Sequence, residues 1–364
     1  MKRNFITLSV LSAALLMAAS CKKSDNNTIT PVYDVPTTYN FANANYADAT
    51  TRLGMITEIQ AVEKVATTGA AVDAQKAKNM FANTGSVFTT AAYNTSGLQL
   101  KDQTAALFQT DALRFIDSLT AVSQTGTVAS RGVAGVGTSS ANAATKYALT
   151  ANGMNYAQVF NKTIMGGLIT YQIVTVMNGA ATGSIDNNTV TNGSTALEHA
   201  WDLAFGYWGV PIDFPTNKTT PKPVLWGSYS TQVDSGFHAN KILMDAFLKG
   251  RAAISHKDTK TIQEQSTIIL QTMERLTGAA VLQEVKEVKE SISDNVARNS
   301  RLSECYGFVY SLKYNPKKTI TDAQIDALLA LFPKNFYDLT LDQVNAIRDA
   351  VAKQYGFEAV KDIL

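Results

Sequence analysis

KYALTANGMNYAQVFNKTIMGGLITYQIVTVM, residues 146–177, is the longest apolar segment of the chain and decides the fold. Its apolar side chains recur around most of the circumference of a helix, a pattern typical of a central core helix. Gly153, Gly166 and Gly167 lie within the segment, and each lowers helix propensity by roughly 1 kcal/mol relative to alanine. These glycines predict that another helix approaches closely, or that the helix kinks.

Further helices are predicted on both sides of this segment, because apolar residues recur there at spacings of three and four. They cover about 48–69, 73–82, 102–122, 195–207, 233–254, 258–290, 291–314, 321–331 and 340–356. Capping boxes are expected at Thr321–Gln324 and Thr340–Gln343. No alternating strand pattern of useful length occurs. The predicted fold class is therefore all-α, a multi-helix bundle of about nine to eleven helices in one or two packed bundles.

The N-terminus has the features of a bacterial lipoprotein signal. Met1-Lys-Arg-Asn precedes an apolar run over residues 5–19, and Ser20-Cys21 follows it. We therefore expect a signal peptide at 1–20, lipidation at Cys21, a flexible polar tether at 21–40 and a helical domain at 41–364. Ala18 stands where such signals usually have a large aliphatic residue, so an ordinary signal peptide with an incidental cysteine is the alternative. Either signal predicts export, and lipidation predicts attachment to the cell envelope, at the periplasmic or surface face of the outer membrane.

Composition narrows the partners. The chain has 32 Lys and Arg residues against 30 Asp and Glu residues, without a basic block, so nucleic acid is not an expected partner. The protein is expected to attach to the membrane through its lipid alone, since no segment after the signal has 18 consecutive apolar residues. Cys305 is the only other cysteine. It lies in an apolar stretch and is predicted to be a buried small apolar residue rather than a nucleophile.

The densest candidate for a functional site is Glu198-His199-Ala200-Trp201-Asp202. On a helix, Glu198, His199 and Asp202 can lean toward one patch because they are three or four residues apart. An imidazole with carboxylates suits a divalent or ferric metal ion, and further ligands would have to come from other helices. The alternative is that His199 is a core histidine with satisfied hydrogen bonds and that Trp201 belongs to the core.

Two polar sets interrupt apolar helices. Asn155, Gln158 and Lys162 follow one another at spacings of three and four, and a buried amide or ammonium group must be hydrogen-bonded. We expect this set to form a binding network with Asp202 or Glu198. In the second set, Arg298 and Arg301 fit a surface salt-bridged stripe. Its third member, Glu304, precedes a segment predicted to be buried and is a candidate supporting ligand for the metal.

Motifs for several enzyme classes are absent from the sequence. It contains no Gly-x-Ser-x-Gly motif, no His-Glu-x-x-His motif and no phosphate-binding glycine loop after a strand. Nucleophilic hydrolysis and zincin chemistry therefore lack support at the level of motifs.

Three segments resemble a family of Gram-negative lipoproteins, the domain of unknown function 4856: Gly153–Gln158 with Lys162 and Gly166, His199–Tyr207, and Leu302–Phe308. The family's biochemistry is unassigned. The chain is also similar to imelysin-like helical-bundle proteins, which are linked to iron uptake and include proteins classed as metallopeptidases. Their Gly-x-His-x-x-Glu signature is nearest to His199-Ala-Trp-Asp202, with Leu197 in place of glycine and aspartate in place of glutamate. This likeness implies an imelysin-like bundle.

Three functions follow as hypotheses. The first is a non-enzymatic, lipid-anchored binding protein for nutrient uptake, linked to iron, with a TonB-dependent outer-membrane receptor as partner. The second is an imelysin-like metallopeptidase. The third is a glycan-binding partner of an outer-membrane transporter, in which exposed Trp208, Trp226 and Tyr229 stack on sugar rings.

Overall fold

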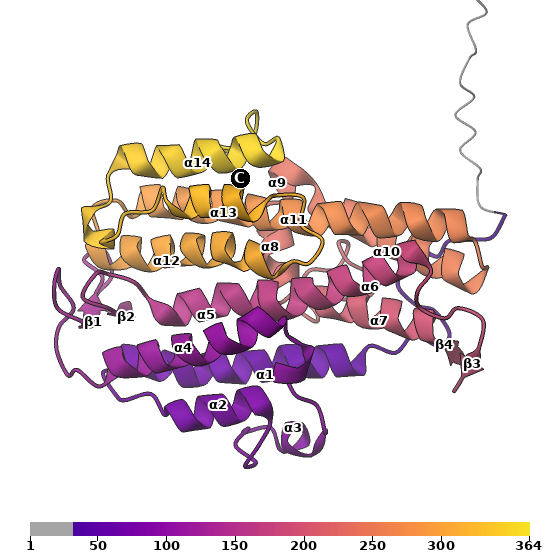
Figure 1. Ribbon diagram of the computed structural model, residues 1–364, viewed down its shortest axis with the longest axis horizontal. Coiled ribbons are helices and arrows are strands. Elements are labelled where there is room, and N and C mark those ends of the chain that lie inside the picture. The colour runs from indigo at the N-terminus through magenta and orange to yellow at the C-terminus, as the bar shows by residue number, and fades with distance from the viewer. Residues whose placement is uncertain (1–31) are drawn as a thin grey trace, which may run out of the picture. The chain divides into compact units, whose positions relative to one another are not determined.

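The apolar segment forms the central helix of the computed structural model, which describes residues 32–364. The helix runs without a break from Tyr156 to Thr182 as α5 (Tyr156–Ile164), a π-helical stretch (Met165–Thr170) and α6 (Tyr171–Thr182). It crosses the middle of the molecule between the N-terminal and C-terminal helices (Figure 1).

Gly166 and Gly167 lie in the π-helical stretch, and both allow close packing. A Cβ atom on Gly166 would lie 2.5 Å from Cβ of Ser311, and one on Gly167 would lie 2.4 Å from Cγ of Phe108. The predicted close approach is therefore confirmed on two sides of the helix.

The start of the predicted helix is wrong. Lys146–Leu149 is strand β2, which pairs antiparallel with β1 (Gly135–Thr138). Gly153 then has a φ of +85°, a left-handed conformation that favours glycine. The helix begins only after Asn155. The side chain of Asn155 caps it by accepting hydrogen bonds from the backbone N–H groups of Ala157 and Gln158.

The other elements surround this helix. The N-terminal part contains α1 (Ala47–Lys64), a 3₁₀ turn (Val65–Thr68), α2 (Ala74–Ala82), α3 (Ala91–Thr95) and α4 (Ala106–Ser123). The middle contains the hairpin β3 (Val190–Thr191) and β4 (Ser194–Thr195), α7 (Ala196–Trp208), α8 (Trp226–Gln232), α9 (Asp234–Phe237) and α10 (Ala239–Ser255). The C-terminal part contains α11 (Thr259–Glu290), α12 (Asn295–Ser311), α13 (Asp322–Leu329) and α14 (Leu341–Tyr355).

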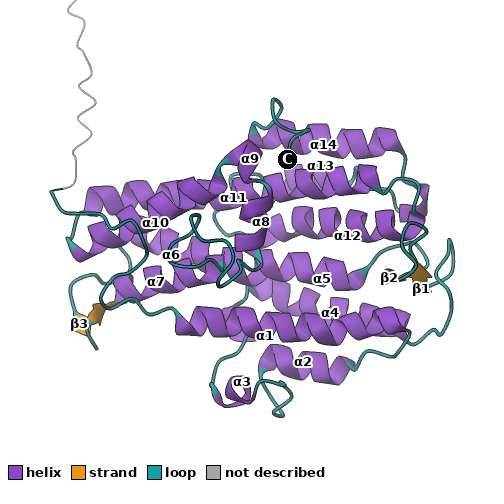
Figure 2. Cartoon of the chain, turned by 180° about the vertical axis from the view of Figure 1, so that it is seen from behind, coloured by secondary structure: helices purple, strands orange, loops and turns teal. Residues whose placement is uncertain are grey.

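The all-α prediction is confirmed. With Tyr156–Thr182 counted once, the described residues contain 13 helices, of which 11 have seven or more residues. Both predicted capping boxes are present, at Thr321–Gln324 and Thr340–Gln343. Between residues 32 and 364 the strands form two small hairpins, both at the periphery of the helices (Figures 1 and 2).

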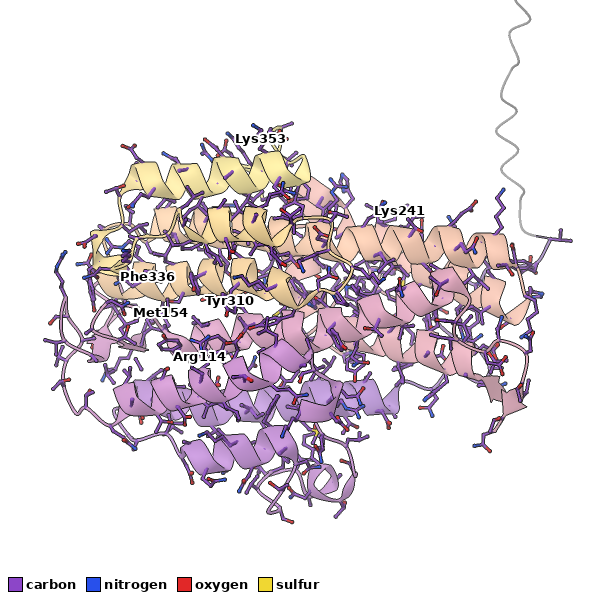
Figure 3. The ribbon with its side chains drawn as sticks, viewed as in Figure 1. Arg114, Met154, Lys241, Tyr310, Phe336 and Lys353 are labelled. Carbon is purple, nitrogen blue, oxygen red and sulfur yellow. The ribbon has the colours of Figure 1, made fainter. Side chains whose placement is uncertain are left out.

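Residues 35–364 form one compact unit. Its longest helix, α11, packs against α10, α12, α6 and α14, while α5 packs between α12 and α4. Side chains fill the spaces between the helices (Figure 3). Tyr310 of α12, labelled there, donates a hydrogen bond to Asp111 of α4 at 3.2 Å. Cys305 is fully buried, as predicted.

The helix Tyr156–Thr182 is long and apolar enough to cross a membrane. Within the described part of the chain no other helix is both long and apolar enough. In Tyr156–Thr182, 67% of the most apolar 18-residue stretch is buried inside the protein. Core packing accounts for its composition.

The predicted signal peptide, Cys21 and most of the tether lie outside the described residues. The end of the predicted tether does not behave as a flexible linker. Tyr39 is buried, its ring stacks on Phe205 with centroids 3.7 Å apart, and its hydroxyl donates to Oδ1 of Asp202 at 2.7 Å. The helical unit therefore begins before residue 41.

Candidate functional site

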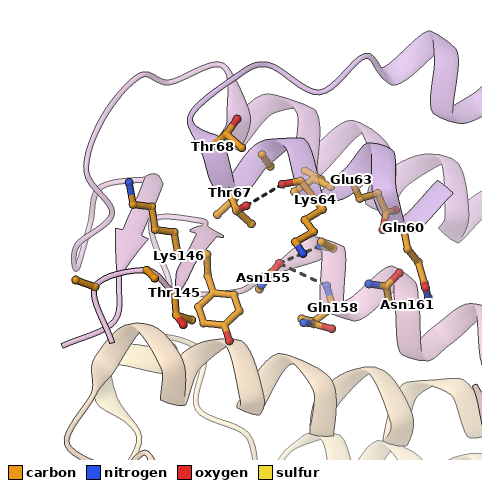
Figure 4. Close-up of a pocket in the computed structure, with 17 residues that line it drawn as sticks. Gln60, Glu63, Lys64, Thr67, Thr68, Thr145, Lys146, Asn155, Gln158 and Asn161 are labelled. Atoms are coloured by element: carbon orange, nitrogen blue, oxygen red, sulfur yellow. Dashed lines mark hydrogen bonds between the residues drawn. The ribbon is translucent and has the colours of Figure 1, made fainter. Parts of the chain in front are cut away.

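A polar pocket of about 890 Å³ lies between α1 and α5 and is bordered by β2. Its volume is in the range of sites that hold small molecules. Its polar lining residues are Gln60, Glu63, Lys64, Thr67, Thr68, Thr145, Lys146, Tyr147, Asn155, Gln158 and Asn161. Figure 4 shows the side chains from α1 facing those from α5 across this space.

Helical spacing accounts for the two facing walls. Gln60, Glu63 and Lys64 are three or four residues apart on α1 and share one side of that helix. Gln158 and Asn161 are three residues apart on α5 and share the side that faces α1. The pocket is therefore lined by neutral amides and one carboxyl group, with lysines from α1 and β2.

Glu63 is the unusual member of this pocket. Its side chain is 1% exposed, and neither carboxyl oxygen has a hydrogen-bond partner among the described residues. Burial raises the pKa of Glu63 well above its usual value, which favours the neutral carboxylic acid. Oδ1 of Asn161, on the opposite wall, is also buried without a described partner. Unpaired buried polar atoms are uncommon in native proteins and call for an explanation.

Asn155, a predicted binding residue, has a structural role at the edge of the pocket. It is 3% exposed and caps α5. Its N–H donates to Oγ of Ser303 at 2.9 Å, and its amide donates to Oγ of Ser300 at 3.0 Å. Asn155 therefore fixes the start of α5 against α12, while Gln158, one turn later, is the member of the predicted set that faces the pocket.

Lys162 is directed to a different, buried cluster. Its Nζ lies 2.8 Å from Oε2 of Glu304, and Arg301 lies 3.2 Å from the other oxygen of that carboxylate. The predicted network with Asp202 or Glu198 is therefore wrong, although Glu304 is buried as expected.

The two carboxyl groups of this cluster have opposite pKa shifts. Burial, with the negative charge of Glu304, raises the pKa of Glu284 to about 8. Burial acts to raise the pKa of Glu304 as well, but the charges of Lys162 and Arg301 outweigh it and hold that pKa below its usual value. Tyr229 donates to Oε1 of Glu284 at 2.6 Å. Glu284 therefore favours its neutral form, while Lys162 and Arg301 compensate the charge of Glu304, and Arg301 also pairs with Glu287 at 2.9 Å.

Asp202 and Glu198, two of the predicted metal ligands, form ion pairs with Arg251. Nε of Arg251 lies 2.8 Å from Oδ1 of Asp202, and another of its nitrogens lies 2.9 Å from Oε1 of Glu198. Arg251 is 2% exposed. This buried ion pair joins α10 to α7 and uses the carboxylates of both predicted ligands. Sequence reasoning missed Arg251, although a single arginine between apolar residues of a predicted helix is a signal for such a pair.

His199 is exposed, whereas Asp202 is completely buried. The prediction that these two side chains share a polar cavity is therefore wrong. Among residues 32–364, no group of three or more His, Cys, Asp and Glu side chains is placed to hold a metal ion. The predicted set of His199, Asp202, Glu198 and Glu304 is divided between a surface position and two separate ion-pair clusters.

The prediction of exposed aromatic residues for sugar stacking is also wrong. Trp208 and Trp226 are completely buried, and Tyr229 is 9% exposed. Trp208 stacks on Phe247, and Nε1 of Trp226 donates to the carbonyl of Met165 at 3.1 Å. These rings are parts of the core.

The sequence did contain a signal for Glu63. Ile56, Ile59 and Glu63 follow the three-and-four spacing of the apolar stripe of α1, and all three are buried. An ionisable residue in such a stripe is a candidate for an unusual environment. Lys146 and Tyr147 could not be placed in this way, because the strand that positions them was predicted to be helical.

The family model for a domain of unknown function, DUF4856, matches residues 36–358. No curated protein and no solved structure matches the chain.

Proposed function

The chain belongs to the DUF4856 family, and from this premise we propose that it is a non-enzymatic envelope protein that binds a small polar solute between α1 and α5. The observation that carries this proposal is the pair of unpaired buried groups in the pocket, the carboxyl of Glu63 and Oδ1 of Asn161. A buried polar group without a partner costs about 1–3 kcal/mol. A solute in the pocket toward which these side chains turn would supply the missing hydrogen bonds and recover that cost.

The chemistry of the lining favours binding over catalysis. The described lining residues contain no histidine, cysteine or serine, and three of them, Gln60, Gln158 and Asn161, are neutral amides directed at the cavity. Amides donate and accept hydrogen bonds but do not transfer protons at neutral pH. A ferric or divalent ion would require several carboxylate or imidazole ligands, so the proposed solute is organic and not a bare metal ion.

The place of action is part of the proposal and depends on the N-terminal sequence. A lipid on Cys21 would hold the helical unit at the outer membrane, where a TonB-dependent receptor is the partner expected for nutrient uptake. The polar pocket would then serve to capture the solute near that receptor.

A binding screen tests the proposal. Full-length protein purified in detergent is heated with a library of sugars, sugar acids, amino acids and small organic acids, and unfolding is followed by tryptophan fluorescence. A solute at about 100 times its Kd stabilises the native state by about 2.7 kcal/mol, which corresponds to a Tm increase of about 4 °C for a folded unit of this size. The increase should disappear in Gln158→Ala and persist in His199→Ala, which alters an exposed residue outside the pocket.

The proposal is overturned if no solute in the library raises Tm. It is also overturned if the solutes that do so stabilise Gln158→Ala and the wild type equally, because they would then bind elsewhere.

A further inference from the structure

The charges of the pocket are unevenly distributed. Its described lining has three ionisable acid or amine groups, and these are Glu63, Lys64 and Lys146. Glu63 is buried in the wall, whereas both lysines are exposed. Figure 4 shows Lys64 extending from α1 into the space above Asn155 and Gln158, with Lys146 at the hairpin end. The wall of the pocket, which contains Glu63, therefore carries no positive charge, whereas the lysines at its opening are positively charged.

Neither lysine is neutralised by the protein. In the described part of the chain, the ammonium groups of Lys64 and Lys146 form no ion pair within 4 Å of a carboxylate. Two unpaired cations at the opening of one pocket can both attract a negatively charged solute.

The interior has a different preference. Gln60, Gln158 and Asn161 each offer an amide, and a protonated Glu63 adds one donor and one acceptor. Hydroxyl and amide groups of a solute both donate and accept, so they match this set. Apolar side chains complete the wall and can contact the C–H surfaces of a ring, namely Ala66, Leu119, Ala148 and Ala157.

Resting on the proposed function, we infer that the solute is a hydroxylated organic acid of the acidic-sugar kind, with its carboxylate at Lys64 and its hydroxyl groups toward Glu63 and Asn161. Lys146 adds positive potential at the hairpin end of the pocket. An ionised wall carboxylate would repel such a solute, whereas a neutral one donates a hydrogen bond to it.

Matched pairs of sugars test this inference. Binding of glucose against glucuronate, and of galactose against galacturonate, is measured by isothermal titration calorimetry with the full-length protein in detergent, beside the tightest ligands of the solute library. We expect an acid to bind at least about tenfold more tightly than its neutral counterpart, as one charge-assisted contact provides. Lys64→Gln should remove most of this difference. Added salt should weaken binding of the acid but not of the neutral sugar.

Lys353→Gln is the matched control, because Lys353 is an exposed lysine on α14, on the opposite side of the bundle from α1 (Figure 3). It should leave the preference for the acid unchanged. A neutral or cationic solute as the tightest ligand, or an acid preference that persists in Lys64→Gln, overturns the inference but leaves solute binding in place. Failure of every library member to bind overturns the proposed function as well, so the two failures are distinguishable.

Discussion

Replacement of Glu63 by methionine should make the protein more stable and abolish solute binding. Methionine has nearly the length of glutamate but no polar oxygen, and the site is 1% exposed. The substitution removes a buried carboxyl group whose oxygens have no described partner, a cost of about 1–3 kcal/mol. We therefore expect Glu63→Met to raise the free energy of unfolding by at least about 2 kcal/mol at neutral pH.

The gain should depend on pH with a definite sign. Burial raises the pKa of Glu63 well above its usual value, so between the unfolded and folded pKa values the native state holds a proton that the unfolded chain has released. Wild-type stability then falls as pH rises above about 4.3, with a maximum slope of about 1.4 kcal/mol per pH unit. The advantage of Glu63→Met should be smallest at pH 4, where only the unpaired neutral carboxyl group contributes, and should increase toward neutral pH.

Urea unfolding of both proteins across this pH range, followed by tryptophan fluorescence, measures the effect as a shift in midpoint at constant slope. Glu58→Met is the control on the same helix. Hydrogen bonds from the N–H groups of Thr89 and Thr90 help to lower the pKa of Glu58, so its loss should destabilise the protein, and more so at neutral pH than at pH 4. A Glu63→Met variant that is less stable than wild type at neutral pH, or a gain independent of pH, would refute the reasoning.

Three further predictions concern the other clusters and the N-terminus. Glu284→Gln should flatten the pH dependence of unfolding between about 4.5 and 8, because the raised pKa of Glu284, about 8, makes the wild type lose stability as pH rises through that window; urea titrations measure the slope. Arg251→Ala should lower the free energy of unfolding by about 3–5 kcal/mol, since it leaves the buried carboxylate of Asp202 without an opposite charge, whereas His199→Ala should change it by less than about 0.5 kcal/mol. Cys21→Ser should abolish incorporation of labelled palmitate and move the protein from the membrane fraction to the soluble fraction.

The sequence predicted what depends on local interactions. The Thr340–Gln343 capping box needs only residues of the same turn, and it was found where expected. Gly167 was recognised as a packing glycine because its cost in a helix has to be offset, but the sequence does not say that Phe108 is the residue it meets.

Interactions between distant segments were not predicted. Glu198 and Asp202 were singled out for a metal because their spacing is favourable for one, but the same spacing serves Arg251, which lies about fifty positions away and is brought to them by the packing of α10 on α7. The sequence of one helix does not tell whether its carboxylates bind a metal ion or an arginine from another helix. Lys162 illustrates the same problem, because its partner Glu304 comes from α12.

The pocket arises where the local pattern and the fold disagree. Residues 146–149 were predicted to be helical, yet they pair with β1 and form an extended strand. That pairing puts Lys146 and Tyr147 in the pocket wall, and it delays the start of α5 to the residue after Asn155. A helix continued back to residue 146 would carry these side chains along the axis of α5 instead of across from α1. The strand therefore creates the end of the pocket at which Lys146 adds positive potential, and a change that restores helix there should weaken binding of the solute without altering Glu63.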